Sequence, residues 1–112
     1  MSCIFCQIAS KEIPVKLIFE DDSLMAFDDL HPVAPVHILI VPKQHIAAIN
    51  DVTKQDGLLL GEMILLAKKI AQDKGVASSG YKLIFNCGED GGQVVQHIHL
   101  HLIGGEKIKC LV

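Results

Sequence analysis

The sequence predicts an α+β fold with a mainly antiparallel sheet. Short β-type runs lie on both sides of one long helical pattern, and most turns between these runs are too short to hold a helical crossover. Only the connection after the third run is long. A chain of 112 residues has the common size of one domain, so we expect a single domain over residues 1–112.

The first half of the chain is expected to form a short helix and three strands. The helix covers residues 3–9, where the apolar side chains gather on one side. Two strands, from Val15 to Glu20 and from Leu24 to Phe27, are joined by a turn at Asp21-Asp22. The third strand runs from His37 to Val41, an apolar and β-branched segment between two prolines.

The long helix is expected from residue 53 to about residue 74. Thr53 and Asp56 fit a variant of the capping box at its start, and Gly75 supplies its stop. The helix is apolar on more than one face. A wide stripe buried within one subunit would explain this, but the pattern favours a stripe that also meets a partner subunit.

The last strand carries three histidines. Two strands are expected from Tyr81 to Asn86 and from Val94 to Ile103, and alternation places His97, His99 and His101 on one face of the second. Same-face neighbours in a strand lie about 6.5–7 Å apart. Three such histidines do not readily converge on one metal ion, and they are better placed to line a phosphoryl group. A lone histidine is usually structural, but three in strict alternation favour a functional site.

A glycine-rich loop at residues 88–92 precedes this strand. Gly91 and Gly92 let the backbone approach a ligand closely, and successive N–H groups there could form an anion-binding nest. Such loops are common in hairpins, so the loop alone indicates little. Beside three imidazoles it predicts a phosphate cradle, to which Asn86 could offer its amide.

The composition argues against nucleic acid and a membrane as binding partners. All ten basic residues are lysines and they form no stripe, which is unlike a nucleic-acid-binding surface. The apolar stretch near residues 58–67 is interrupted and falls short of the roughly 20 residues that a membrane span needs. The start of the chain lacks the pattern of a secretion signal, so we expect a cytoplasmic protein with reduced cysteines.

The segment from Gly91 to Gly105 resembles the H-φ-H-φ-H-φ-φ signature of the histidine triad family. Segments such as Lys11-Glu12-Ile13-Pro14 and Ala34-Pro35-Val36-His37 follow the family order, and the Hint branch is the most similar. The resemblance implies a five-stranded antiparallel sheet with one long helix and a short N-terminal helix. It also implies a homodimer with a joined ten-stranded sheet, and hydrolysis of purine nucleoside 5′-phosphoramidates to a nucleoside monophosphate and an amine.

The same resemblance implies roles for individual residues. His99 would be the nucleophile that forms a covalent nucleotidyl-histidine, His101 would contact the phosphate oxygens, and His37 and His97 would complete the catalytic cluster without a cofactor. A neutral histidine can attack near pH 7 when its other nitrogen is held as N–H, usually by a backbone carbonyl. Asp29 would bind the ribose hydroxyls, although a purely structural role for Asp29 in a turn is the alternative. The other expected nucleotide-binding residues are Leu30, Asn86, Gly92, Gln93, Val94, His99, His101, Ile4, Phe5, Ile8, Phe27 and Leu39.

One departure from the family pattern leaves an alternative open. Val94 stands where many Hint enzymes carry a serine or another polar residue near the leaving group. A nucleotide-binding module with little turnover is therefore the second hypothesis. A hydrolase with zinc at its catalytic centre is the third, and a dithiol oxidoreductase is the last, because the Cys3/Cys6 pair does not follow a strand of a βαβ unit.

A structural zinc site is also expected. Cys3 and Cys6 have the C-x-x-C spacing of a zinc half-site. The spacing does not identify two further ligands, but resemblance to triad proteins with a similar Cys-Ile-Phe-Cys start implies His45 and His97. The alternative is that no metal binds and that Cys3 and Cys6 pack in the interior as small hydrophobic residues.

Overall fold

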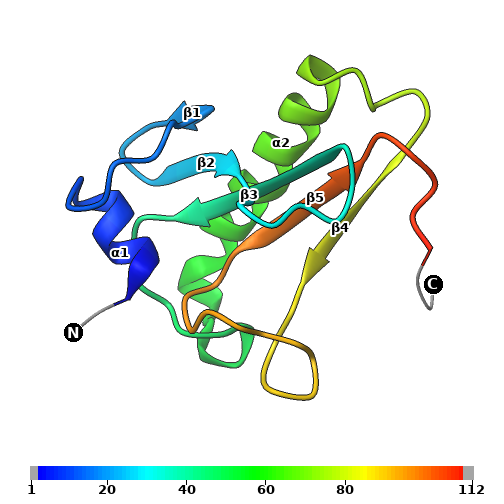
Figure 1. Cartoon of the computed structure of the whole chain (residues 1–112). Coiled ribbons are helices and arrows are strands. Elements are labelled where there is room, and N and C mark those ends of the chain that lie inside the picture. The colour runs from blue at the N-terminus through cyan, green and yellow to red at the C-terminus, as the bar shows by residue number, and fades with distance from the viewer. Residues whose placement is uncertain (1–2, 110–112) are drawn as a thin grey trace.

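The computed structural model describes residues 3–109, which form a five-stranded antiparallel sheet with a short and a long α-helix (Figure 1). This architecture confirms the predicted fold class. The elements are α1 (Ile4–Ala9), β1 (Phe19–Glu20), β2 (Leu24–Asp28), β3 (Val36–Pro42), α2 (Gly57–Asp73), β4 (Tyr81–Phe85) and β5 (Leu100–Gly104), with 3₁₀ turns at Ile49–Asp51 and Lys54–Asp56.

The strands lie in the order β1-β2-β3-β5-β4, and every neighbouring pair is antiparallel. The long helix makes the connection from β3 on one side of the centre to β4 at the edge. The last strand then returns between them, with Leu39 of β3 opposite His101 of β5. The centre of the sheet is therefore built by β3 and β5, which are the two strands that carry histidines.

The sheet separates two apolar clusters, because successive side chains of a strand point to opposite faces. On one face α2 covers Ile38 and Ile40 of β3 and Leu100 of β5. On the other face α1 covers Leu39 and Val41, the alternate residues of β3. Figure 1 shows α2 behind the sheet and α1 in front of its left end. The histidine of β5 shares the α1 face, so this face holds the candidate site.

The predicted strand from Val94 to Ile103 was wrong over residues 94–99, because β5 begins only at Leu100. The preceding residues instead form a loop whose amide at Ile98 donates to the carbonyl of Ile46 at 2.7 Å. Gly92, with φ +80°, turns the chain into this path. Alternation therefore does not describe His97 and His99.

Smaller differences concern element ends. The first predicted strand survives only as Phe19–Glu20. The capping box is present, since the Thr53 amide donates to the Asp56 carboxylate at 2.9 Å, but it caps the 3₁₀ turn from which α2 continues. No helix in residues 3–109 is long and apolar enough to span a bilayer.

Candidate functional site

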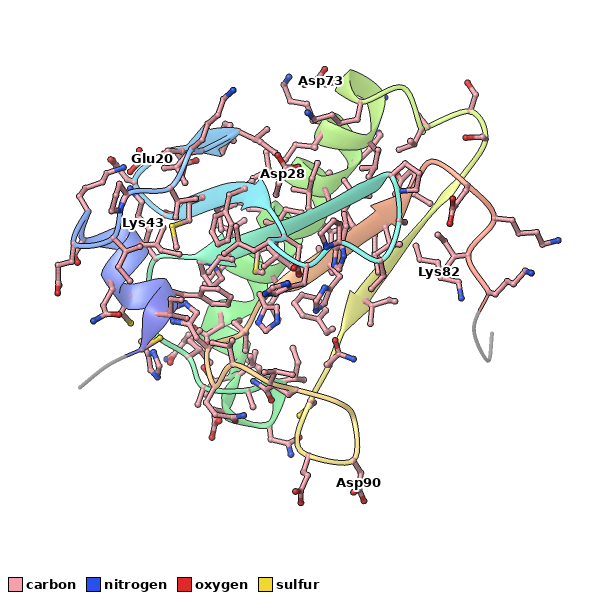
Figure 2. All side chains as sticks on the ribbon, viewed as in Figure 1. Glu20, Asp28, Lys43, Asp73, Lys82 and Asp90 are labelled. Carbon is pink, nitrogen blue, oxygen red and sulfur yellow. The ribbon has the colours of Figure 1, made fainter. Side chains whose placement is uncertain are left out.

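A cavity of about 470 Å³ opens on the α1 face of the sheet. Its apolar part lies between α1 and the strands β2 and β3, and its polar part lies toward the loop before β5. Figure 2 shows Asp28 at the end of β2, beside this region, and Asp90 at the tip of the loop between β4 and β5. The cavity is lined by Ile4, Phe5, Ile8, Val15, Phe27, Asp28, Asp29, Leu30, His31, Leu39, Asn86, Gly92, Val94, Val95, His99 and His101.

This lining contains every residue that was expected to contact a nucleotide, with the exception of Gln93. The buried Gln93 side chain instead accepts a hydrogen bond from the Gly88 amide and donates to the carbonyls of Ala47 and Val95. The Gln93 side chain therefore holds the loop together, and it is not among the side chains that line the cavity. His37 and His97 lie behind the lining.

Four lining residues were not anticipated: Val15, Asp28, His31 and Val95. Asp28 and Val95 are adjacent in the sequence to the expected site residues Asp29 and Val94, so their positions could have indicated that they line the cavity. Val15 begins the first expected strand, and His31 follows the expected ribose-binding residue Asp29 by two positions. No local sequence pattern indicates that these two residues line a cavity, because they lie in loops that the tertiary fold brings to it.

His99 is held with one nitrogen free to react. Its Nδ1 lies 2.8 Å from the carbonyl oxygen of His97. A carbonyl only accepts, so Nδ1 carries the hydrogen and Nε2 keeps its lone pair. The ring is buried, with the Phe5 ring centroid 5.1 Å away in an edge-on arrangement. The backbone carbonyl predicted for a histidine nucleophile is therefore present.

A second hydrogen-bond chain fixes His101. The amide of Val33 donates to Nδ1 of His37 at 3.1 Å, which leaves the hydrogen of His37 on Nε2. That Nε2 lies 2.9 Å from Nδ1 of His101 and donates to it. The hydrogen of a neutral His101 must therefore be on Nε2, where it can serve as a donor.

Burial, together with the neighbouring rings of His99 and His37, lowers the pKa of His101 to about 4. The nearby carboxylate of Asp29 acts in the opposite direction but does not prevail. His101 is therefore neutral near pH 7. The site offers one imidazole lone pair on His99 and one imidazole N–H on His101.

The Asp29 carboxylate is partly engaged by the protein. One of its oxygens accepts a hydrogen bond from the His31 amide at 2.8 Å, and the other lies 3.4 Å from Nε2 of His37. Ligand atoms of Asp29, His37 and His101 lie close enough to hold a metal ion. The hydrogen on Nε2 of His37 occupies the lone-pair direction that a metal would need, so this cluster is better described as a hydrogen-bond relay.

The glycine-rich loop does not form the expected nest. The amides of Gly92 and Gln93 donate at 3.0 Å to the carbonyls of Glu89 and Gly88, so they are not available to an anion. Within residues 3–109, the amide of Val94 has no hydrogen-bond partner, and this residue is 89% exposed at the cavity. The amide of Val94 is therefore available for a backbone contact to a phosphate at the cavity.

A second cluster joins Cys3, Cys6, His45 and His97. Nδ1 of His97 lies 3.3 Å from Sγ of Cys3, 3.6 Å from Sγ of Cys6 and 3.1 Å from Nδ1 of His45. Around a tetrahedral zinc ion the usual bond lengths give edges of about 3.3 Å between two nitrogens and about 3.6 Å between nitrogen and sulfur. The four atoms are therefore spaced as zinc ligands.

The protonation of His97 suits the same role. Its Nε2 lies 2.7 Å from the carbonyl of Pro42 and donates to it, so Nδ1 presents a lone pair to the two sulfurs and to His45. Burial is the main cause that lowers the pKa of His97. A neutral ring with a fixed tautomer is what a metal requires. The cluster supplies four protein ligands and so leaves no open coordination position, which argues against a zinc ion that activates water.

Comparisons with known proteins agree with this geometry. Residues 2–110 match the family described as scavenger mRNA decapping enzyme C-terminal binding. The purine nucleoside phosphoramidase of Escherichia coli K12 is 47% identical over 105 residues, which are 94% of this chain and 88% of that protein. The structure of a HIT family hydrolase from Legionella pneumophila has a TM-score of 0.94 at 51% identity and 96% coverage of both chains. A zinc-bound histidine triad family protein from Mycobacterium smegmatis has a TM-score of 0.82 at 28% identity, covering 97% of this chain and 81% of that one.

The depressed pKa of His101 predicts a loss of stability in mild acid. An unfolded histidine takes up a proton near pH 6.5, whereas folded His101 does so only near pH 4. The unfolded state therefore binds more protons between these values, and stability falls as the pH is lowered from about 6.5 toward 4. Urea unfolding at pH 7.5 and pH 5 should show a smaller loss for His101→Gln than for the wild type. Equal losses in the two proteins would contradict the lowered pKa of His101.

Proposed function

The chain belongs to the histidine triad family, and from this premise we propose that it hydrolyses the P–N bond of purine nucleoside 5′-phosphoramidates. The observation that carries the proposal is the hydrogen bond from Nδ1 of His99 to the carbonyl of His97, at the polar end of an apolar cavity. The bond leaves a nucleophilic nitrogen beside a neutral N–H donor. An apolar slot next to such a pair suits a base and its phosphate.

The proposed reaction has two steps. Nε2 of His99 attacks phosphorus, a new N–P bond forms, and the amine departs with its bonding electrons and takes up a proton. Water then attacks phosphorus, the bond to His99 breaks, and a nucleoside monophosphate leaves. Nε2–H of His101 and the amide of Val94 would donate to the phosphate oxygens as negative charge develops on them.

The apolar residues from α1, β2 and β3 are proposed to hold the purine. Asp29 is proposed to accept hydrogen bonds from the ribose hydroxyls, because each carboxylate oxygen has a lone pair beyond the contact it already makes. AMP or GMP is the expected product. Asn86, whose side-chain amide donates to the Gly91 carbonyl at 2.8 Å, would fix the loop at the phosphate end.

A nucleotide-binding module with little turnover is the second candidate. It is favoured by Val94, which is 89% exposed at the cavity and has no hydroxyl to assist the departing amine. Both candidates require the same purine slot. Turnover of an adenosine phosphoramidate under single-turnover and steady-state conditions separates them.

We further propose that Cys3, Cys6, His45 and His97 hold one structural zinc ion. The donor set, its spacing and the fixed lone pair of His97 support this assignment. When bound, zinc would supply a closed tetrahedral link between α1 and the loop before β5. It would take no part in the reaction. A cytoplasmic, reducing location would keep the two cysteines available, and it remains a prediction.

We propose that the interface of the expected homodimer is formed by α2 and β4. Ile64 and Leu65 of α2 are exposed, as is Leu58 near its start, while the neighbouring Met63 and Leu66 are buried against the sheet. Among residues 3–109, strand β4 is the outermost strand next to β5, so pairing of two β4 strands across the interface would join the sheets into ten strands.

The nucleophile assignment predicts that His99→Ala lowers phosphoramidase turnover by roughly 10³-fold or more, because the covalent route is lost. His99→Asn is the matched variant, since its side-chain amide can still donate to the His97 carbonyl. Both variants should keep the circular dichroism spectrum and AMP binding of the wild type. Retention of a tenth of the wild-type rate by either variant would remove His99 from the role of nucleophile.

The zinc assignment predicts close to one zinc per chain in protein purified without chelator. Cys3→Ala/Cys6→Ala should contain none and should melt at least about 4 °C lower, which corresponds to about 1 kcal/mol for a domain of this size. Cys87→Ala, at a cysteine outside the cluster, is the control and should match the wild type in zinc content. Wild-type protein without zinc, together with an unchanged melting temperature in the double variant, would remove the site and leave the catalytic assignment standing.

The dimer assignment predicts that sedimentation gives twice the chain mass of 12.2 kDa. Leu65→Glu places a charge at the centre of the exposed apolar face and should give a monomer, whereas Lys74→Glu at the end of the same helix should remain dimeric. A wild-type monomer, or a Leu65→Glu dimer of unchanged stability, would contradict this interface.

A further inference from the structure

The cysteine pair lies where a chemical change in it would reach the nucleotide cavity. Cys3 caps α1, and Cys6 lies in its first turn. The same helix contributes Ile4, Phe5 and Ile8 to the cavity wall. The Phe5 ring centroid lies 5.7 Å from that of His97 and 5.1 Å from that of His99. The cluster, α1 and the nucleophile are therefore in direct contact.

The pair is also accessible. Cys3 and Cys6 are only partly buried, and His45 is exposed. A second cavity of about 390 Å³ is lined by Cys3 and His45, and it shares Ile4, Val94 and Val95 with the nucleotide cavity. A small molecule can therefore approach the sulfur of Cys3 from solvent.

The spacing of the two cysteines permits a disulfide without unfolding of α1. Residues three apart at the start of a helix have Cα atoms about 5 Å apart, which lies within the range that disulfides bridge. The Cys6 amide donates to Sγ of Cys3 at 3.5 Å, and Nδ1 of His97 lies 3.3 Å from Sγ of Cys3 and 3.6 Å from Sγ of Cys6, so both sulfurs approach the same atom. Ligand atoms of all four residues in the cluster lie within 4.8 Å of one another.

We propose that Cys3 and Cys6 are a reversible oxidation site, at which a hydroperoxide converts the zinc-bound thiolate pair into a disulfide and releases the metal. The inference rests on the zinc centre proposed above, and it does not depend on the phosphoramidase reaction.

The chemistry balances with the peroxide as oxidant. One thiolate attacks a peroxide oxygen, the O–O bond breaks, and a sulfenic acid and a hydroxide ion form. The second thiolate attacks the sulfenic sulfur, the S–S bond forms, and a second hydroxide ion leaves. The two sulfurs lose two electrons and the peroxide gains them. Cys3 and Cys6 would then no longer offer thiolates to a zinc ion, and His45 and His97 alone would bind the ion too weakly to retain it.

The consequence is a looser purine slot in a protein that stays folded. Phe5 and Ile8 remain buried in the α1-side cluster, so α1 stays docked. The link from the start of α1 to His97 is lost, and Ile4, whose side chain is exposed, gains conformational freedom that a bound purine must remove. We expect AMP to bind about three- to tenfold more weakly, which is the cost of ordering one flexible side chain.

The test treats zinc-loaded protein with hydrogen peroxide and follows three quantities: released zinc, the state of each cysteine by alkylation and mass spectrometry, and the AMP dissociation constant by calorimetry. The wild type should release one zinc per Cys3–Cys6 disulfide, and dithiothreitol with added zinc should restore both. Cys3→Ser keeps a helix-capping side chain but removes one thiol, so it should form no such disulfide. Cys87→Ser should respond as the wild type does.

Each other outcome overturns a stated part of the inference. Zinc release without a Cys3–Cys6 disulfide, or oxidation of Cys87 before the pair, removes the oxidation site. Disulfide formation with unchanged AMP affinity removes the coupling to the cavity. Protein that purifies without zinc removes the metal centre and this inference with it. A protein that releases zinc as expected but cleaves no phosphoramidate instead refutes the proposed reaction alone.

Discussion

The hydrogen bond between Nδ1 of His99 and the carbonyl of His97 is the interaction on which the rest of the site depends. It decides which nitrogen of His99 carries the lone pair, and it places that nitrogen at the cavity. The bond in turn depends on the position of His97, whose Nε2 is anchored to the Pro42 carbonyl at the end of β3. A fully buried residue that does not line the cavity therefore controls the nucleophile.

Two hydrogen-bond chains of opposite polarity meet in this site. In the first chain the His97 carbonyl accepts from Nδ1 of His99 and leaves a lone pair on Nε2 of His99. The second chain runs from the Val33 amide through His37 to His101 and leaves an N–H on Nε2 of His101. The His101 ring stays neutral, because burial and neighbouring imidazoles keep the pKa of His101 well below pH 7. A nucleophile and a hydrogen-bond donor are thus obtained from the same residue type, through one backbone carbonyl, one backbone amide and the side chain of His37, and without arginine.

The fold and most of the cavity could be predicted from the sequence, because they follow from local patterns and from a specific motif. The apolar, β-branched run of β3 and the capping box before α2 are local, and both are present. The path of residues 94–99 is not local. It is set by Gly92 and by a bond from Ile98 to Ile46, a partner that lies 52 positions earlier. The same contacts turn Gln93 inward and use up the loop amides, so a nest could not be excluded from sequence alone.

The measurement that tests the central claim most directly is mass spectrometry of the protein, stopped by acid-free denaturation during turnover of an adenosine phosphoramidate. The account predicts an added adenylyl group on a peptide that contains His99, and loss of this adduct as substrate is exhausted. It also predicts that the adduct is absent in His99→Asn. Steady turnover with no adduct on any histidine, or an adduct on His97 or His101, would contradict the assignment of the reactive lone pair.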